Sequence, residues 1–411
     1  MRAVSRVAAT IVLTAVGAVA GLPSARPIQA AEGVRRPLGL DLYRPNPDEN
    51  PLTRAKIDLG RRLFRDKRLS RDGSMACISC HDPARAFTNS ETVAKGVGGR
   101  RGTRNVPTIV NRAWGRSFFW DGRAPTLEDQ VLQPILHADE LAMTAARVVA
   151  LATSDRYRQR FTAAFGAMSD WSAPDPGRGS TRGSGESARS LADAAFGLSR
   201  TRSSSAGAPG RQPDPPVRSE AQRQREASGV VDDPYDGLTA SDAWTLRQVA
   251  LALAAYVRTI QAGASPYDRY ITGRRDALSA PARRGLDIFR GKGGCTGCHV
   301  GPTFSDEEFH NTGVAWRTGV LTDEGRARVT RAAADRGAFK TPTLREVART
   351  APYMHDGSFA TLAEVVAFYS RGGAPNPGLD SQLRPLALTP AEQEDLIAFL
   401  RSLSGQRREG E

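Results

Sequence analysis

Apolar side chains recur along this chain with mainly helical spacing, and the signals for β-strands are weak throughout. The helical spacing is clearest in two stretches of similar sequence, "GRRLFRDKRLSRDGSMACISCH" and "RRGLDIFRGKGGCTGCH". Each stretch runs from an amphipathic segment through a glycine turn into a pair of cysteines. The apolar positions that mark the two segments are Ile57, Leu63, Phe64, Leu286, Ile288 and Phe289. The repeat predicts two related helical units in one chain.

Capping residues predict further helices in the C-terminal part of the chain. In "LTPAEQEDLIAFLRSL", Thr389 is a predicted N-cap, Pro390 occupies the first helical position and Glu392 completes a capping box. Thr361 and Glu364 form a second predicted capping box. The apolar faces behind these caps consist of Leu362, Val365, Val366, Tyr369, Leu396, Phe399, Leu400 and Leu403. The predicted fold class is therefore mainly α.

Residues 1–31 have the pattern of a secretory signal peptide, with a short basic start, the apolar run "VAATIVLTAVGAVAG" and small residues before the expected cleavage after Ala30 or Ala31. The alternative is an uncleaved anchor, for which the apolar run falls short of the roughly 20 residues that span a bilayer. No later segment is long and apolar enough for that purpose. We therefore expect a periplasmic protein without stable membrane insertion.

A change in composition divides the remaining chain. Residues 173–235 are rich in Gly, Ser, Pro and Arg and poor in aromatic residues. Such a segment buries too little apolar surface to offset the entropy lost on ordering, so it is predicted to be a mostly disordered insertion. The sequence thus predicts an N-terminal domain over residues 32–172 and a C-terminal domain over residues 236–411.

The chain is basic, with 57 Lys and Arg against 44 Asp and Glu and a net charge of +13. Arginine supplies most of this charge and is spread along the sequence, without the basic tracts and interleaved aromatic residues of a nucleic-acid groove. We therefore expect no nucleic-acid partner. Attraction to an acidic partner protein is left open.

The four cysteines form two motifs of the same kind, Cys77-x-x-Cys80-His81 and Cys295-x-x-Cys298-His299. A zinc site would have to join both pairs, but they lie much farther apart than the roughly 15–20 residues of common four-cysteine sites. A redox dithiol would not require a histidine behind each pair. Covalent haem attachment explains both motifs, because each thiol forms a thioether and the adjacent histidine becomes the proximal iron ligand. The sequence therefore predicts two c-type haems.

The two motifs together with "RNVPTIVNRAWGRSFFWDGRAPTLEDQ", "AAYVRTIQAGASPYDRY" and "TPTLREVARTAPYMHDGSFATLAEVVAFYSRGG" resemble the bacterial di-haem cytochrome c peroxidase family, in particular its MauG-like branch. The resemblance implies two cytochrome-c-like helical domains, each enclosing one haem. It also implies an oxidoreductase that acts on hydrogen peroxide. The electron donor would be a small cytochrome c or copper protein, or a protein substrate would be oxidised instead.

The resemblance makes the haem on Cys77, Cys80 and His81 the peroxide site. Glu140, twenty residues after Trp120, matches the family's acid/base residue, which takes a proton from one peroxide oxygen and returns it to the departing oxygen. The family lines the same pocket with residues that match Gln130 and Pro134. The local sequence offers another interpretation of Asp139 and Glu140, as charges that interact with the N-terminal dipole of the helix predicted at "AMTAARVVALA".

Two departures from the family pattern concern this pocket. Val97 stands where some members carry a histidine that plugs the iron, so the resemblance implies an open pocket. His137, in "HADEL", is a surface residue, a proton donor or an unexpected iron ligand.

For the second haem, the resemblance assigns the axial position to Tyr369, where typical cytochrome c peroxidases have methionine. An anionic phenolate favours oxidised iron, whereas methionine raises the potential. The local alternative is a tyrosine packed in the core, because Tyr369 lies on an apolar helix face. Met354 is the competing ligand.

Three further roles follow from the resemblance. Trp120 would relay electrons between the haems or would simply pack between the domains. Arg123 would pair with a haem propionate or form a structural salt bridge. The positions that match the family's calcium site are Asn105, Thr350 and Pro352. Oxygen donors of this kind suit calcium.

The residues and the resemblance together predict a periplasmic di-haem peroxidase or MauG-like oxidase, with Trp120 between its two haems. One alternative is an ordinary cytochrome c peroxidase fed by a small redox protein. The other is a non-enzymatic electron-transfer cytochrome in which both irons have six ligands. Val97 and Glu140 speak against the second alternative, and iron ligation by His137 would favour it.

Overall fold

The structure is a computed structural model, and it describes residues 37–40, 46–166 and 238–410. The expected signal peptide over 1–31 and the expected insertion over 173–235 lie outside the described residues. The described chain is mostly helical with a few short strands, which confirms the predicted fold class.

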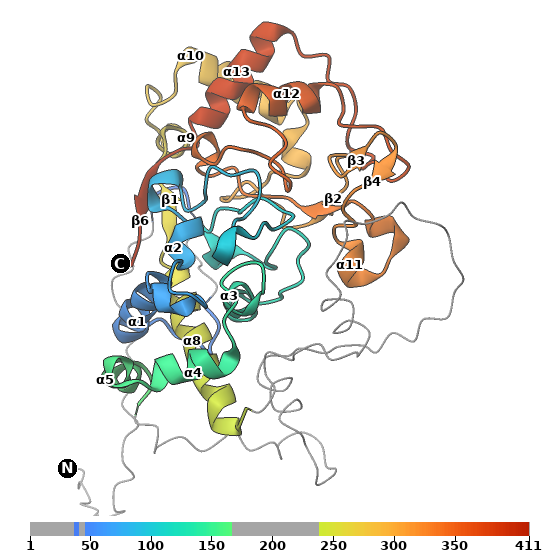
Figure 1. The fold of residues 1–411 in the computed structure, drawn as a ribbon. Coiled ribbons are helices and arrows are strands. Elements are labelled where there is room, and N and C mark those ends of the chain that lie inside the picture. Colours follow the sequence, from blue (N-terminus) through green and yellow to red (C-terminus); the bar gives the residue numbers. More distant parts are fainter. Residues whose placement is uncertain (1–36, 41–45, 167–237, 411) are drawn as a thin grey trace, which may run out of the picture.

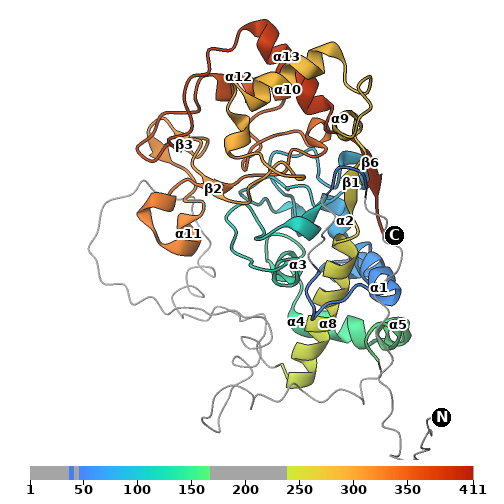
Figure 2. The same cartoon turned by 180° about the vertical axis from the view of Figure 1, so that it is seen from behind.

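The helices form two groups, at the lower and upper ends of the molecule in Figure 1. Figure 2 shows the same two groups from behind. In the lower group, shorter helices surround the long helix α8. This group consists of α1 (Arg54–Phe64), α2 (Cys77–Cys80), α3 (Leu127–Leu136), α4 (Ala145–Thr153), α5 (Asp155–Phe165) and α8 (Ala240–Val257).

Helix α8 is buried almost throughout its length, and its side chains share one hydrophobic core with α1, α3, α4 and α5. A bidentate ion pair adds to this packing, since the Arg258 guanidinium donates to both Glu128 carboxylate oxygens at 2.5 and 2.8 Å. The structure therefore differs from the expected division, which begins the C-terminal domain at residue 236. The reason is that the apolar surface of α8 is covered by helices from the N-terminal part of the chain.

The upper group forms a second, separate core. Its helices are α9 (Pro266–Ile271), α10 (Ala280–Arg290), α12 (Leu362–Ser370) and α13 (Pro390–Arg401). The short helix α11 (Ala327–Thr330) lies to the side of the molecule in Figure 1, outside this core. The predicted capping boxes at Thr361 and Thr389 are confirmed, because each hydroxyl accepts from the backbone N–H three residues later and each glutamate accepts in return. Leu396, Phe399 and Leu400 are buried, as the apolar face of α13 predicts.

The strands form three antiparallel pairs that tie distant segments together. They are β1 (Gln261–Gly263) with β6 (Gln406–Arg408), β2 (Phe309–His310) with β5 (Phe339–Lys340), and β3 (Trp316–Arg317) with β4 (Val320–Leu321). In the first pair Gln261 lies opposite Arg408, which returns the C-terminal end to the lower group. There the Gly410 amide donates to the Thr259 hydroxyl at 2.7 Å.

A glycine permits the closest helix contact in each group. A Cβ atom added to Gly60 of α1 would lie 1.9 Å from the Ala252 carbonyl oxygen of α8, and one added to Gly285 of α10 would lie 1.9 Å from the Asp395 carbonyl oxygen of α13. Only glycine leaves room for two helix backbones to approach this closely. These two helices lead into the two cysteine motifs, so the internal repeat recognised in the sequence is a repeated helix crossing.

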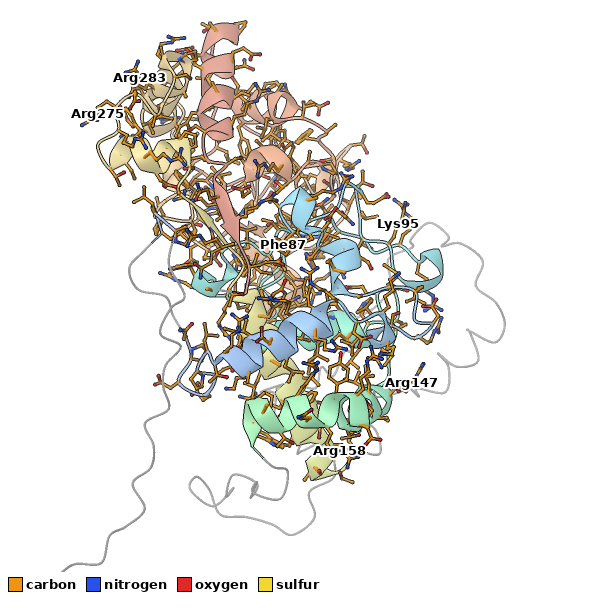
Figure 3. The ribbon with its side chains drawn as sticks, turned by 90° about the vertical axis from the view of Figure 1, so that its left-hand side faces the viewer. Phe87, Lys95, Arg147, Arg158, Arg275 and Arg283 are labelled. Atoms are coloured by element: carbon orange, nitrogen blue, oxygen red, sulfur yellow. The ribbon has the colours of Figure 1, made fainter. Side chains whose placement is uncertain are left out.

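Exposed arginines are distributed over the molecule. Figure 3 shows Arg147 and Arg158 on α4 and α5 at one end and Arg275 and Arg283 near α10 at the other. The excess positive charge is thus spread over opposite ends of the molecule. Within the described ranges, no helix is long and apolar enough to cross a membrane.

The crossing at Gly60 can be tested with Gly60→Ala. In an ordinary helix interior this substitution stabilises by about 1 kcal/mol, whereas overpacking costs about 1–3 kcal/mol. Because the added Cβ meets backbone rather than a flexible side chain, we expect a net loss of about 1–2 kcal/mol in the free energy of unfolding by urea. Gly102→Ala is the control, since its Cβ would lie 3.4 Å from the Ala94 side chain. Equal stability of the two variants would contradict the close crossing.

Candidate functional site

The first cysteine motif opens into a cavity. Cys77 and Cys80 lie on the one-turn helix α2, and His81 follows at its end. The space between its lining residues, counted together with the solvent at its open mouth, is about 650 Å³. Its other lining residues include Phe64, Met75, Lys95, Gly96, Ile109, Gln130, Pro134, Glu140, Leu253 and Val257. The structure therefore brings Gln130, Pro134 and Glu140 to the first motif, as the resemblance implies.

The histidines of both motifs are held in the form that can bind a metal. His81 Nδ1 lies 2.9 Å from the Phe87 carbonyl oxygen, and His299 Nδ1 lies 2.8 Å from the Phe304 carbonyl oxygen. A carbonyl only accepts, so Nδ1 carries the proton and Nε2 keeps its lone pair. Burial lowers the pKa of both imidazoles, which favours the neutral form.

The cysteines lack the features of a shared zinc site and of a reactive dithiol. Within the described part of the chain they are free thiols, and the two pairs belong to different halves of the molecule, which excludes one shared zinc ion. Burial raises the pKa of Cys77 to about 12 and that of Cys80 to about 11. A reactive dithiol needs a lowered pKa, so the redox alternative is disfavoured. Thiols and a ligating histidine on a mainly apolar cavity fit a haem.

Glu140 is the acidic side chain of this cavity. Burial raises the pKa of its carboxyl group, while the nearby charges of His137 and Arg123 act in the opposite direction. Helix α4 has its N-cap at Thr144, so Glu140 lies outside the first turn of that helix. Because the effect of the dipole falls off within the first turn, the geometry does not favour the alternative that Asp139 and Glu140 serve the helix dipole.

Val97 and His137 both lie outside the cavity lining. Val97 is buried, and its backbone N–H donates to the Glu140 carbonyl oxygen at 2.8 Å. His137 is exposed at the end of α3, and its Nδ1 accepts from the Asp139 N–H at 3.2 Å. Of the three interpretations of His137, the geometry supports the surface residue.

Tyr369 lies beside the second motif. It is on α12, and burial, followed by the proximity of Cys298 and Cys295, raises the pKa of its phenol. A hydrogen bond from Thr312, which the sequence analysis did not single out, acts in the opposite direction by favouring the phenolate. Met354 is half-buried in the segment before α12, with a positive φ of 73°.

Trp120 lies where the two halves meet. Its indole Nε1 donates to the Asn105 carbonyl oxygen at 2.9 Å, and its own carbonyl oxygen accepts from the Lys340 N–H at 2.8 Å. Asn105 in turn donates its N–H to the His355 carbonyl oxygen at 2.7 Å. Backbone hydrogen bonds thus join the segment containing Trp120 to the upper half.

Asn105 is also suited to the predicted calcium site. Its amide Nδ2 donates to the carbonyl oxygens of Glu91 and Thr92 at 3.0 and 3.3 Å, which orients the side-chain oxygen away from them. Thr350 and Pro352 lie in the upper half, shortly before His355, whose carbonyl oxygen accepts from Asn105. Calcium binding by Asn105, Thr350 and Pro352 stays a prediction.

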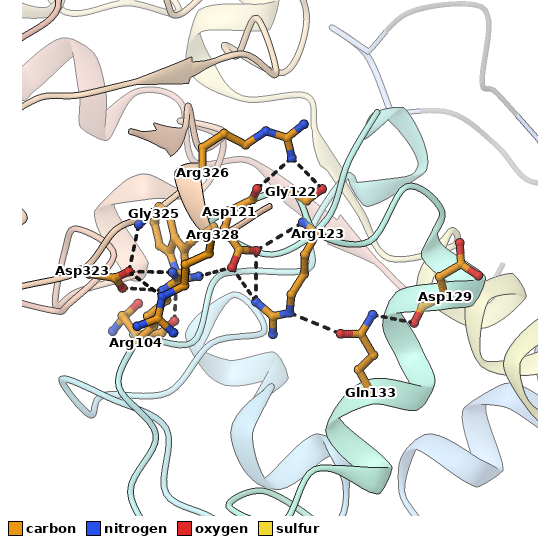
Figure 4. A network of polar contacts seen from close by, with 12 residues as sticks. Arg104, Asp121, Gly122, Arg123, Asp129, Gln133, Asp323, Gly325, Arg326 and Arg328 are labelled. Carbon is orange, nitrogen blue, oxygen red and sulfur yellow. Dashed lines mark hydrogen bonds and ion pairs between the residues drawn. The ribbon is translucent and has the colours of Figure 1, made fainter. Parts of the chain in front are cut away.

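Ion pairs reinforce the same junction, as Figure 4 shows. Arg104 donates to Asp121 at 2.6 Å and to both carboxylate oxygens of Asp323 at 2.7 and 2.9 Å. Arg123 pairs with Asp121 at 3.1 Å, and its guanidinium lies 3.5 Å from the Phe119 ring centroid. The geometry of Arg123 is that of the structural salt bridge, and contact with a haem propionate stays a prediction.

A polar cluster beside the second motif was not found from the sequence. His310 Nδ1 lies 2.6 Å from Asp380 and its Nε2 lies 2.9 Å from Asp306. Hydrogen bonding to Cys298, Asp380 and Asp306 raises the pKa of His310 to about 10, against the effect of burial. Asp306 and His310 are spaced by four residues, but Asp380 is joined to them only by the fold.

A cavity at one cysteine motif, a tyrosine beside the other and a polar junction between them fit a cytochrome with two haem sites. The family model for di-haem cytochrome c peroxidases matches residues 54–198. The chain belongs to the di-haem cytochrome c peroxidase family and is an oxidoreductase of that class. The family accounts for two haems in this chain.

Similar proteins include both named branches of the family. The methylamine utilization protein MauG of Methylorubrum extorquens is 32% identical over 88% of this chain and 82% of its own length. The cytochrome-c peroxidase IdrP1 of Denitromonas iodatirespirans is 32% identical over 94% and 91%.

Solved structures agree on the fold. A MauG-like protein associated with microbial copper homeostasis has a TM-score of 0.63 at 28% identity, covering 93% of this chain and 96% of that one. The diheme peroxidase BthA of Burkholderia thailandensis has a TM-score of 0.60 at 23% identity, covering 89% and 87%, and shows the fold alone.

The ion pairs of the junction can be tested with Arg104→Ala. Its side chain is 14% exposed, and its removal takes both short hydrogen bonds from the largely buried Asp323 carboxylate and one from Asp121, which keeps its pairing with Arg123. We expect a loss of about 3 kcal/mol in the free energy of unfolding, measured with urea. Arg328→Ala is the control, because Arg328 is 64% exposed and lies 3.9 Å from the same Asp323 carboxylate. It should cost at most about 1 kcal/mol, and an equal loss in both variants would contradict the assignment.

Proposed function

We propose that this protein is a periplasmic di-haem peroxidase of the MauG-like type, which reduces hydrogen peroxide at the cavity of the first motif. The observation that carries the proposal is the shared cavity of Cys77, Cys80, His81, Gln130 and Glu140. A haem attachment site and a protonatable carboxyl group thus face the same open space. An electron-transfer cytochrome has no need of this combination.

Each motif would hold its haem by two thioether bonds and one histidine. Cys77, Cys80 and His81 would hold the first haem, and Cys295, Cys298 and His299 the second. When bound, the haems supply iron centres that accept oxidising equivalents from peroxide and store them between the two sites. The Nδ1 hydrogen bonds of His81 and His299 would keep both imidazoles oriented toward the metal.

Glu140 would move the proton on which the reaction depends. Its carboxylate accepts a proton from one oxygen of hydrogen peroxide and donates it to the other oxygen, which leaves as water. Gln130 would hold the peroxide by a hydrogen bond, and Pro134 would restrict the space around it. The balance is one hydrogen peroxide, two protons and two electrons giving two waters.

The electrons would come from a small cytochrome c, a copper protein or an oxidisable protein substrate. Trp120 would relay them between the two haem sites, because its indole and its carbonyl are both bonded at the junction. A calcium ion held by Asn105, Thr350 and Pro352 would stabilise the same junction. The periplasmic location rests on the signal peptide predicted over residues 1–31.

Tyr369 favours the MauG-like type over an ordinary cytochrome c peroxidase. Its half-buried phenol lies beside Cys298 and Cys295, where burial and these neighbours raise its pKa, so the phenolate would form only on binding to the iron. A phenolate on the second iron would lower its potential and would help it to share oxidising equivalents.

The acid/base role predicts that Glu140→Gln lowers the second-order rate constant for peroxide by about 10²–10⁴-fold. Because burial raises the pKa of Glu140, the carboxylate form is lost as the pH falls through a value above the ordinary one of about 4.3. As the pH is lowered, the wild-type rate should therefore fall with a midpoint above about 4.3. The rate of the Glu140→Gln variant should not show this pH dependence. Stopped-flow kinetics from pH 4 to 9 would measure both.

Arg147→Gln is the control for this experiment, since Arg147 on α4 is exposed and outside the cavity lining. It should retain the wild-type rate. A Glu140→Gln variant with the wild-type rate and pH profile would refute the proposed role.

The second site predicts the low-temperature EPR spectrum of the ferric protein. We expect one high-spin signal from the open first haem and one low-spin signal from the second haem with Tyr369 as ligand. Tyr369→Phe should convert the low-spin signal to high spin and raise the midpoint potential, because the phenolate is lost. Tyr353→Phe is the control, as the Tyr353 hydroxyl donates to the Val347 carbonyl oxygen at 3.0 Å. Two low-spin signals in the unmodified protein would mean that the first site is not open.

A further inference from the structure

The turn that carries Glu140 is hydrogen-bonded to a neighbouring loop. Val97 donates its backbone N–H to the Glu140 carbonyl oxygen at 2.8 Å, and the Arg100 guanidinium donates to the Ala138 carbonyl oxygen, also at 2.8 Å. The loop is closed on itself, since the Gly96 N–H donates to the Arg100 carbonyl oxygen at 2.8 Å. We call residues 96–100 the clamp loop.

Gly96 permits the close approach of the two segments. It is buried, and its φ of −107° is open to any residue, so backbone conformation is not the reason for glycine. A Cβ atom at this position would lie 2.1 Å from the Asp139 carbonyl oxygen and 2.6 Å from that of Glu140. Any side chain here would force the turn and the loop apart.

The clamp loop also lies beside the first cysteine motif. The carbonyl oxygen of Lys95 is 3.8 Å from Cys80 Sγ, and Lys95, Gly96, Cys80 and Glu140 all line the same cavity. The loop therefore spans the space between the motif and the acid. Its width determines how far the Glu140 carboxyl group stands from the motif.

Contacts within the turn do not determine that distance. The Glu140 N–H donates to the His137 carbonyl oxygen at 3.0 Å, and the Asp139 N–H donates to His137 Nδ1 at 3.2 Å. These bonds shape the turn locally, but they would survive if the whole turn moved outward. External contacts oppose this movement: the clamp loop bonds to Ala138 and Glu140, and the Arg71 N–H donates to the Leu141 carbonyl oxygen at 2.9 Å.

We propose that Gly96 and Arg100 are positioning residues for Glu140, which hold its turn against the first motif so that the carboxyl group stands in the cavity. This proposal rests on the proposed function, because it concerns the residue assigned to proton transfer. The clamp acts through steric fit at Gly96 and through the guanidinium hydrogen bond of Arg100. Neither residue has to touch the peroxide.

Gly96→Ala is the first test. We expect the second-order rate constant for peroxide to fall by about 10²-fold, the usual effect of misplacing a reacting group by about 1 Å. Haem content and the EPR signal of the second haem should stay unchanged. Gly102→Ala, two residues beyond the clamp loop and with its Cβ 3.4 Å from Ala94, is the control and should react like the wild type.

The protonation of Glu140 gives a readout independent of turnover. The charged groups that act on this carboxyl group are His137 and Asp139 on its own turn and Arg123 on the loop before α3. Since burial is the main cause of its raised pKa, outward movement in Gly96→Ala should bring the pKa down toward the ordinary value. The carboxyl stretch in infrared difference spectra, assigned with Glu140→Gln, would measure this shift.

A double-mutant cycle separates the clamp from general damage to the fold. If Gly96 acts through Glu140, Gly96→Ala should have no further effect on the peroxide rate in a Glu140→Gln background. Arg100→Gln removes one hydrogen bond at an exposed residue without adding an atom to the contact. It should lower the rate in the same direction, by a smaller factor, and it tests the proposal even if Gly96→Ala does not fold.

The outcomes distinguish the two proposals. If Gly96→Ala and Arg100→Gln react at the wild-type rate while Glu140→Gln does not, the clamp is refuted and the proposed function stands. If Gly96→Ala lowers the rate equally with and without Glu140, the loop acts on something other than this carboxyl group and the clamp is likewise refuted. If Glu140→Gln itself reacts like the wild type, the proposed function fails.

Discussion

The close crossing of two helix backbones at a glycine is the constraint on which the rest of the structure depends. It occurs once in each half, at Gly60 against Ala252 and at Gly285 against Asp395. In both halves the helix that crosses precedes the cysteine motif, since α1 ends at Phe64 before Cys77 and α10 ends at Arg290 before Cys295. The crossing therefore determines where each motif begins and which helix surface lies behind it. A side chain at either glycine would separate the helices and displace the motif.

The two halves use the same local device and then diverge. In each, the histidine behind the cysteines donates its Nδ1 proton to the carbonyl oxygen of a phenylalanine with positive φ, Phe87 or Phe304. Beyond this point the first half has a cavity with Glu140, whereas the second half brings a half-buried tyrosine to its motif. One repeated framework thus supports two sites with different side chains opposite the motif. The difference arises from the segments on the far side of each site.

Backbone hydrogen bonds and largely buried ion pairs join the two halves. Trp120 and Asn105 bond to the backbone of the upper half, and Arg104 reaches Asp323 across the same junction. Helix α8 is separated in sequence from α5, the preceding helix of the first half, but it packs in the core of that half. The chain therefore crosses between the halves more than once, which opposes their independent movement.

The sequence by itself determined the helical class, the repeated motifs and the caps at Thr361 and Thr389, because these depend on residues near one another in the chain. The resemblance added Glu140 and Tyr369, and the structure brings each to a cysteine motif. Only the tertiary structure decided that α8 belongs to the first core and that Asp380 joins His310. The close contact between Gly96 and the turn of Glu140 could not be inferred from the sequence either. Such contacts depend on which surfaces meet in space, and no local pattern of residues records that choice.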